Sequence, residues 1–169
     1  EVPPLEQPHI KVAQQIWGEG FMRPGGAAAI LTLVKPFAIN PSMTVMEFGA
    51  GLGGGTRAVS AEFDVWVHGF EPDPILAAGG HELSVKKGTK KAEIKPCTMQ
   101  DFQPKAASYD CVYSSEALYK VPEKEKVLTV CERALKARGQ IALTDFVRTP
   151  GTKPDDSRLT SFATRTGKP

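Results

Sequence analysis

A run of glycines behind a short apolar segment is the feature of this sequence best suited to bind a ligand. Gly49, Gly51 and Gly54 satisfy the pattern G-x-G-x-x-G, and residues 44–48 before them are apolar enough to form a strand. Glycine lacks a Cβ, so the backbone can turn sharply and bring its N–H groups close to a nucleotide-like ligand. The pattern alone is weak, but a strand before it and a helix after it strengthen the prediction.

An acidic residue stands at the distance that such a loop requires. Glu71 follows the predicted strand 65–70 and lies about 20 residues after Gly51. A carboxylate in this position can accept hydrogen bonds from both hydroxyl groups of a ribose. The competing interpretation is a surface glutamate beside a glycine-rich turn, which the agreement of loop, acid and strand–helix order disfavours.

The charge directly before the loop separates two classes of nucleotide-like ligand. Glu47 would repel the pyrophosphate of a dinucleotide, whereas it suits S-adenosylmethionine, which carries a cationic sulfonium and an amino group. Glu47 and the triple glycine at 53–55 therefore disfavour a nicotinamide-dependent oxidoreductase, which stays an alternative. Glu47 can also be a strand-end residue that backbone N–H groups cap.

Residues behind the predicted strand 109–114 are the candidates for contact with a second substrate, because ligands of open α/β sheets bind beyond the carboxyl ends of the strands. If the ligand is S-adenosylmethionine, transfer of its methyl group would require the protein to align a nucleophile and to exclude water. Glu116 and Tyr119 can contact an amine or a hydroxyl and are the predicted catalytic residues. In the alternative, Glu116 caps a turn and Tyr119 packs under a lid.

The elements that must position these residues alternate along the chain. Helices are predicted over residues 27–36, 55–63, 74–86 and 122–136, and strands over 44–48, 65–70, 92–99, 109–114 and 140–147. Strands separated by helices of this length imply right-handed crossovers. The predicted fold is α/β, a doubly wound parallel sheet of about five strands flanked by helices.

The composition divides the chain into three parts. Residues 1–26 are predicted to form an N-terminal arm and lid helix, and residues 27–148 the cofactor-binding core. Residues 149–169 are polar, basic and poor in large apolar groups, so a loop or disordered tail is expected there.

The overall composition excludes several classes of protein. The chain has 169 residues, 21 Lys and Arg against 19 Asp and Glu, and a formal net charge of +2, which is too balanced for an obvious nucleic-acid binder. No apolar run approaches the ~20 residues of a membrane span, and no signal peptide is visible. Three cysteines without CxxC spacing and three scattered histidines argue against disulfides and a metal site. A cytoplasmic protein is expected, and a homo-oligomer is compatible with the sequence.

Taken in order, these segments resemble the class I S-adenosylmethionine-dependent methyltransferases. The resemblance rests on VMEFGAGLGGG at 45–55, VHGFEP at 67–72, YDCVYS at 109–114 and the segment 133–145. IWGEGF at 16–21 and PGG at 24–26 are similar to the phosphoethanolamine N-methyltransferase branch, with sarcosine and other small-amine methyltransferases close in pattern. The resemblance implies a Rossmann-like fold, S-adenosylmethionine as cofactor, and a small-molecule methyl acceptor, with an amine nitrogen favoured.

Carried over by position, the resemblance also implies roles for individual residues. Gly49, Ala50 and Gly51 are expected to line the methionine part of the cofactor, and Glu47 is expected to order the loop. Glu71 is expected to hold the ribose diol, and Pro72 to pack on the adenine. Thr98 and Met99 are expected at the adenine edge, although Thr98 is not acidic and Asp101 can replace it if the register shifts. Arg23 is expected near the cofactor carboxylate, and Ser114 faces the donor methyl.

Three positions depart from the phosphoethanolamine branch. Where that branch has a histidine, an arginine and a tyrosine, this sequence has Lys120, Ser115 and Leu5. The identity of the methyl acceptor is therefore open. Nothing after Thr149 looks like the last two strands of the family. An inactive S-adenosylmethionine-binding fragment or module is therefore the alternative to an active enzyme.

Overall fold

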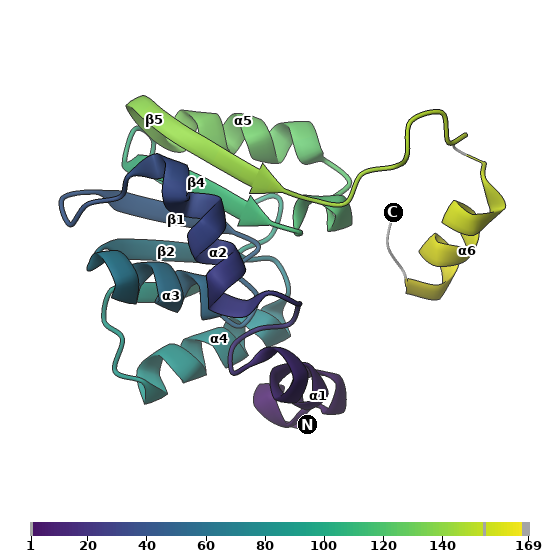
Figure 1. Ribbon diagram of the computed structural model, residues 1–169, viewed down its shortest axis with the longest axis horizontal. Helices are drawn as coiled ribbons and strands as arrows, with labels where there is room; N and C mark the ends of the chain where they lie inside the picture. Colours follow the sequence, from purple (N-terminus) through teal and green to yellow (C-terminus); the bar gives the residue numbers. More distant parts are fainter. Residues whose placement is uncertain (1, 154, 167–169) are drawn as a thin grey trace.

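One parallel sheet of five strands, in the order β3-β2-β1-β4-β5, forms the centre of the molecule (Figure 1). This computed structural model describes residues 2–153 and 155–166, without the side chains of 165 and 166. The strands are β1 (Thr44–Phe48), β2 (Trp66–Glu71), β3 (Ala92–Pro96), β4 (Tyr109–Ser115) and β5 (Leu135–Thr144). The chain order reverses between β1 and β4, so the predicted doubly wound, Rossmann-like sheet is confirmed.

Helices cover both faces of this sheet. Figure 1 shows α2 (Gly26–Val34) and α3 (Gly54–Phe63) on one face and α5 (Lys124–Ala134) on the other. The helix α4 (Pro74–Lys86) packs on β2 and β3, while α1 (Pro8–Trp17) and α6 (Ser157–Thr166) lie near the ends of the chain. Three short 3₁₀ turns, η1 (Pro4–Glu6), η2 (Lys35–Phe37) and η3 (Leu118–Lys120), complete the elements.

The strands read as continuous apolar runs because both faces of the sheet are covered. Val45 and Val67 are partners in the β1–β2 register, and both side chains are fully buried under α2 and α3. Met46 and Phe48 point to the other face and pack with Val127 of α5. Burial of these side chains removes apolar surface from water, which holds the helices on the sheet.

Two predicted boundaries near the end of the chain are wrong. The helix expected over 122–136 ends at Ala134, and the strand expected from Gln140 begins at Leu135. Leu135 pairs with Tyr109, and the register shifts before Cys111. Arg138 takes a left-handed backbone conformation inside this irregular start of β5. A change of register of this kind leaves no periodic signal in the sequence.

The loop or tail expected over residues 149–169 is also wrong for most of the described part, because 157–166 form α6. The Asp156 side chain caps this helix by accepting a hydrogen bond from the Arg158 backbone N–H at 2.9 Å. Leu159, Phe162 and Ala163 share one face of the helix and line a hollow beside residues 146–149. Residues 154 and 167–169 of the predicted tail lie outside the described residues.

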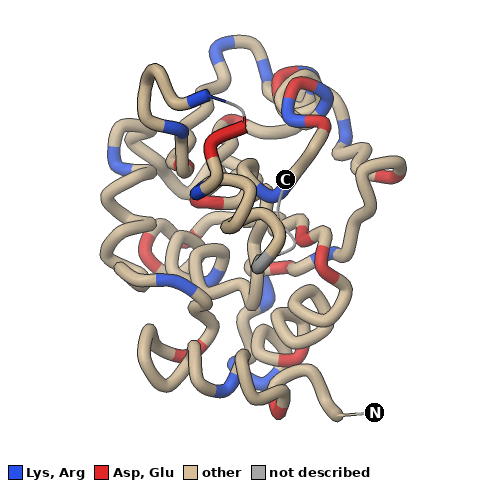
Figure 2. Tube along the Cα trace, turned by 90° about the vertical axis from the view of Figure 1, so that its right-hand side faces the viewer, with Lys and Arg blue, Asp and Glu red and all other residues tan. Residues whose placement is uncertain are grey.

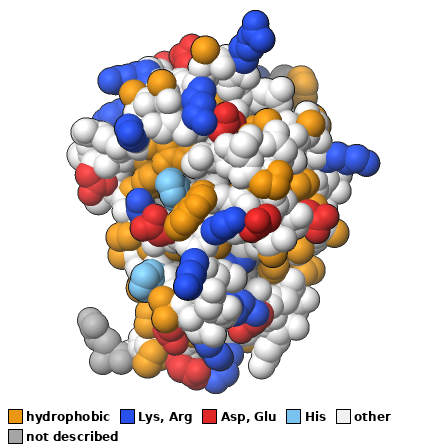
Figure 3. Space-filling model, turned by 90° about the vertical axis from the view of Figure 1, so that its left-hand side faces the viewer, with side chains coloured by type: hydrophobic (Ala, Val, Ile, Leu, Met, Phe, Trp, Pro, Cys, Tyr) orange, Lys and Arg blue, Asp and Glu red, His pale blue; other side chains and the backbone are white. Residues whose placement is uncertain are grey.

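Charged residues of both signs are distributed over the molecule. Figures 2 and 3, seen from opposite sides of the molecule, show basic and acidic residues interspersed over both faces. Among the described residues, no helix combines the length and apolar character that a bilayer span needs. The three cysteines are buried and free.

Candidate cofactor site

The strand order brings three loops together at the carboxyl edge of the sheet. The glycine loop follows β1, Glu71 ends β2, and Ser115 and Glu116 follow β4. Because β1 lies between β2 and β4, these groups meet at the point where the strand order reverses. The N-terminal segment between α1 and α2 crosses the same edge, since Gly20 accepts a hydrogen bond from the Gly54 N–H at 3.0 Å.

The glycines of the loop are required by its geometry. Gly49 and Gly51 have φ values of +77° and +56°, in the left-handed region that favours glycine. A Cβ on Gly49 would lie 2.1 Å from the Cβ of Ala117, whereas a Cβ on Gly51 would meet nothing within 4 Å. The first glycine therefore allows close packing of two loops. The second leaves an open cradle into which its missing side chain would otherwise project.

The Glu71 carboxylate forms a hydrogen bond with the glycine loop. Its Oε2 accepts a hydrogen bond from the Gly51 N–H at 2.6 Å, and its Oε1 accepts one from the Asp73 N–H at 2.8 Å. Burial raises the pKa of this carboxyl, while the two backbone donors and the nearby Lys120 ammonium oppose the rise. The carboxylate is thus held rigidly at the rim of the cradle.

Glu47 lies under the loop, almost fully buried. Its Oε2 accepts a hydrogen bond from the Thr56 hydroxyl at 2.5 Å. Burial raises the pKa of Glu47 to about 7, although Thr56, Tyr113 and the Arg23 charge lower it. The Tyr113 hydroxyl is also buried, and its burial and the neighbouring Glu47 raise its pKa. The two groups form a polar pair inside an otherwise apolar layer.

Arg57 is a structural residue of the site that the sequence analysis missed. Its side chain is 6% exposed and donates hydrogen bonds to the Leu52 carbonyl at 2.7 Å, the Gly80 carbonyl at 3.3 Å and the Ser84 hydroxyl at 3.1 Å. Burial lowers its pKa. The guanidinium joins α3, the glycine loop and α4. A single arginine in an amphipathic helix gives no sequence signal for such a role.

Two cavities open beside the loop. The Glu47 cavity, of about 210 Å³, lies between the loop, α2 and the ends of β4 and β5. The Glu71 cavity, of about 240 Å³, lies between the loop, the start of α4 and η3. The residues that line both cavities are Met22, Arg23 and Gly51. The two cavities therefore lie on either side of the Gly51 cradle.

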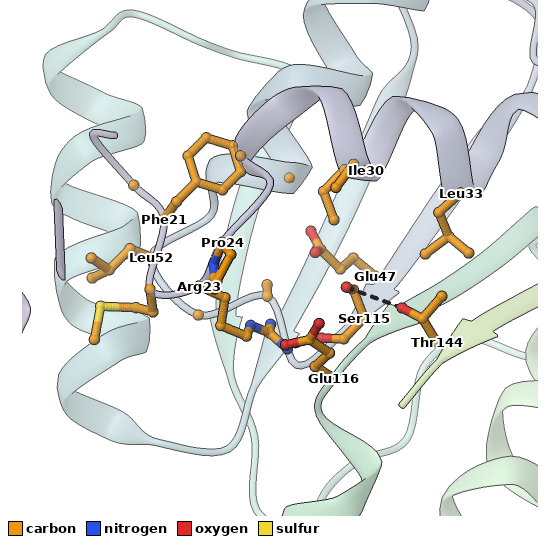
Figure 4. A pocket seen from close by; sticks show the side chains of 17 residues that line it. Phe21, Arg23, Pro24, Ile30, Leu33, Glu47, Leu52, Ser115, Glu116 and Thr144 are labelled. Carbon is orange, nitrogen blue, oxygen red and sulfur yellow. Dashed lines mark hydrogen bonds and ion pairs between the residues drawn. The ribbon is translucent and has the colours of Figure 1, made fainter. Parts of the chain in front are cut away.

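Arg23 and Glu116 point toward one another across the Glu47 cavity (Figure 4). The Arg23 Nη1 lies 4.0 Å from the Glu116 Oε2, and the same nitrogen donates a hydrogen bond to the Ser115 carbonyl. Glu116 has a φ of +51°, and its N–H donates to the Thr144 carbonyl at 2.7 Å. The backbone of β4 is thereby turned so that a carboxylate and a guanidinium face each other in the cavity.

The structure brings most of the predicted cofactor residues together. Those that line one cavity or both are Arg23, Glu47, Gly49, Ala50, Gly51, Glu71 and Pro72, and the predicted catalytic residue Glu116 lines the Glu47 cavity. The predicted catalytic pair is divided, since Tyr119, in the middle of η3, lines neither of these cavities and instead lines the hollow between residues 146–149 and α6.

Three predicted contacts lie elsewhere. Thr98 lines neither cavity, because its Oγ1 accepts a hydrogen bond from the Asp101 N–H and its own N–H donates to the Asp101 carboxylate. Met99 faces a separate hollow beside α5. The Ser114 hydroxyl donates to the Phe48 carbonyl at 2.8 Å, so it ties β4 to β1. The polar groups of Thr98 and Ser114, which were expected to contact the cofactor, instead form hydrogen bonds within the protein.

In the described part of the chain, no three His, Cys, Asp or Glu side chains are grouped so that they could hold a metal ion. The chemistry of the site rests on carboxylates, one guanidinium and backbone N–H groups. Such groups suit a ligand with a sugar diol, a carboxylate and a positive charge.

Comparison with known proteins agrees with this geometry. The family profile described as a methyltransferase domain matches residues 46–143, from within β1 to within β5. The chain belongs to this methyltransferase family. Among curated relatives, phosphoethanolamine N-methyltransferase 2 of Caenorhabditis elegans is 30% identical over 149 residues, which are 86% of this chain and 34% of the relative. The chain thus spans about a third of the length of that relative.

Two further comparisons extend this result. Phosphoethanolamine N-methyltransferase of Plasmodium falciparum is 24% identical over 87% of this chain and 55% of its own length. The solved structure of Haemonchus contortus phosphoethanolamine N-methyltransferase 2, in complex with S-adenosyl-L-methionine, is 22% identical with a TM-score of 0.85. The matched region covers 97% of this chain and 39% of the Haemonchus contortus chain. The last similarity shows that the fold is shared.

Proposed function

We propose that this chain is the cofactor-binding part of an S-adenosylmethionine-dependent methyltransferase that acts on a small amine. The observation that carries the proposal is the open cradle at Gly51, with the buried Glu71 carboxylate bound to its rim. The relatives named above are amine N-methyltransferases, and one of them is solved with S-adenosylmethionine. An inactive module and a nicotinamide-dependent oxidoreductase have no support among the relatives.

The residues of the two cavities fit each part of this cofactor. The Glu71 carboxylate, next to Pro72 in the Glu71 cavity, would hold the ribose diol, with the adenine beyond it. The methionine end would enter the Glu47 cavity, where the Arg23 guanidinium suits its carboxylate and the buried Glu47 suits its cationic groups. A dinucleotide fits less well, because Glu47 would face a pyrophosphate.

The residues of the site explain how such a transfer proceeds. When bound, the cofactor would supply an electrophilic methyl group on a sulfonium, from which the thioether would leave with the electron pair of the broken bond. The amine nitrogen must attack with a free lone pair and in line with that bond, so an acceptor that enters as an ammonium ion must first lose a proton. Glu116 stands at the carboxyl end of β4 in the Glu47 cavity, and we assign to it the acceptance of the amine proton.

Calorimetric titration tests the cofactor assignment. S-adenosylmethionine is expected to bind, with 1:1 stoichiometry, more tightly than NAD at the same salt concentration. A tighter NAD complex would contradict the proposal and restore the oxidoreductase alternative. S-adenosylhomocysteine, which lacks the sulfonium charge, measures how much of the affinity depends on that charge.

Transfer of a radiolabelled methyl group tests the acceptor. Ethanolamine, phosphoethanolamine and sarcosine form the panel, because each offers an amine nitrogen of a different charge environment. Glu116→Gln should lower kcat by about 10²–10⁴-fold without a matching loss of cofactor affinity. Glu132→Gln, on the exposed face of α5, is the matched control. Equal kcat values for Glu116→Gln and the control would remove Glu116 from the chemistry.

A further inference from the structure

A larger hollow lies outside the cofactor site, on the face of the sheet that α5 covers. This α5 hollow, of about 560 Å³, lies between α5 and the loop 99–106. It shares no lining residue with the Glu47 cavity or the Glu71 cavity. Its volume falls within the range of about 300–1,000 Å³ that is typical of sites for small organic ligands. The proposed function assigns nothing to it.

An irregular connection between two strands creates this hollow. The connections before and after β2 contain α3 and α4, whereas the connection from β3 to β4, residues 97–108, contains no helix. Phe102 anchors this loop to the sheet, because its side chain is 2% exposed and its ring centroid lies 4.9 Å from that of Phe48 and 5.3 Å from that of Phe70. Space beside Phe102 therefore remains open against α5.

One stripe of α5 forms the opposite wall of the hollow. Its residues recur at the spacing of a single helical face, and they are Lys126, Thr129, Val130 and Arg133. The stripe that contains Val127 is instead buried in the core. Lys126 and Arg133 are separated by about 10 Å along the helix axis. A cation therefore stands at each end of the wall.

The floor of the hollow is apolar. Phe102 belongs to the buried core, and Met99 and Val130 are partly buried and pack against the same core. The polar side chains that the loop contributes, Gln100 and Gln103, are exposed and uncharged. Contact of an apolar chain with this floor would remove apolar surface from water on both sides, which favours binding.

The charge of the hollow is positive. The described residues that line it include two cations and no acidic side chain. The Lys126 ammonium is paired with Glu123, at 3.6 Å between Nζ and Oε2. Asp101 of the loop does not line the hollow, and its carboxylate accepts a hydrogen bond from the Thr98 N–H. The Arg133 side chain makes no hydrogen bond or ion pair with another residue that the structure describes, so an anion at this end of the hollow would gain a guanidinium partner.

We propose that the α5 hollow binds an amphipathic anion, with a carboxylate or phosphate group at Arg133 and an apolar chain over Phe102 and Met99. The charge of the wall and the apolar floor select the two parts of this ligand. The guanidinium presents paired N–H donors that match two oxygens of such a head group. The inference goes beyond the proposed function, because the hollow and the cofactor cavities share no residue.

Octanoate is the probe for this site, because its extended chain is comparable in length to the wall between Lys126 and Arg133. Titrated into the isotopically labelled chain, octanoate should shift the amide signals of residues 99–106 and 126–133. Arg133→Gln should raise the Kd for octanoate at least about fivefold. Arg148→Gln, at an exposed position outside the hollow, is the matched control and should bind like the wild type. Equal Kd values for the two variants, or no shifts in these two segments, would overturn the proposal.

Probes that change one part of the ligand test its chemistry. Octylammonium keeps the chain and reverses the charge, octanol removes the charge, and acetate keeps the carboxylate without the chain. Each should bind to the hollow at least about fivefold more weakly than octanoate. Equal binding of octylammonium or octanol would refute the preference for an anion, and equal binding of acetate would refute the role of the apolar floor. Amide signals of Arg133→Gln that match the wild type away from the hollow show that the variant is folded.

Discussion

The Gly51 backbone N–H donates a hydrogen bond of 2.6 Å to the Glu71 carboxylate, which lies 20 residues away in the sequence and on the neighbouring strand. The bond joins the turn after β1 to the end of β2 at the edge where the Glu71 cavity opens. One oxygen of Glu71 therefore positions the loop, and the carboxylate as a whole remains at the rim of the cradle. Loop and acid act as a single unit.

Removal of this carboxylate should weaken cofactor binding. Glu71→Ala is expected to cost about 1–3 kcal/mol in binding of S-adenosylmethionine, because charge-assisted hydrogen bonds to the ligand and the loop are lost. Isothermal titration calorimetry measures the change. Glu82→Ala, on the exposed side of α4, should bind like the wild type. An unchanged Kd for Glu71→Ala would place the ribose elsewhere.

Occlusion of the cradle can be separated from backbone strain. Gly51 and Gly88 both have positive φ values, +56° and +63°, and a Cβ on either would meet nothing within 4 Å. Gly51→Val and Gly88→Val should therefore suffer similar strain and similar losses in thermal stability. Only Gly51→Val should abolish cofactor binding, because its side chain projects into the cradle. Loss of binding in both variants would attribute the effect to strain instead.

Burial of Glu47 makes stability depend on pH. Its pKa is about 7 in the folded chain and 4.5 in the unfolded one, so the folded state holds the proton more tightly. The resulting stabilisation is complete below pH 4.5 and is lost as the pH rises through about 7. Relative to Glu47→Gln, the wild type should lose up to about 3 kcal/mol over this range. Chemical denaturation at several pH values checks this, and parallel curves for the two proteins would contradict it.

The buried Arg57 should matter for stability more than its surface counterparts. Arg57→Met would leave the Leu52 and Gly80 carbonyls without a strong donor, and the expected loss is about 2–4 kcal/mol in the free energy of unfolding. Urea denaturation measures the loss. Arg133→Met, at an exposed position of α5, should stay within about 0.5 kcal/mol of the wild type. Similar values for the two variants would show that Arg57 is dispensable.

The expectations that depended on short stretches of sequence agree best with the structure. The helix over 74–86 has the predicted bounds, since Asp73 caps it and Pro74 begins it. The placement of Glu71 on the strand beside the glycine loop also followed from spacing, because one βαβ unit fixes the distance between Gly51 and Glu71. Thr98 and Met99, which were expected at the adenine edge, line neither cavity of the site. Thr98 forms a turn with Asp101, and Met99 faces a separate hollow.

The sequence by itself determined the alternation of strands and helices, the glycine loop and the acid that accompanies it, because each of these is written in local spacing and in hydrophobic period. Only the tertiary structure decided that Glu116 faces Arg23, that Tyr119 lies outside the Glu47 and Glu71 cavities, and that α6 lines a hollow with residues 146–149. These relationships join segments far apart in the chain. Packing of the whole sheet and its covering helices fixes them, and no local pattern records that packing.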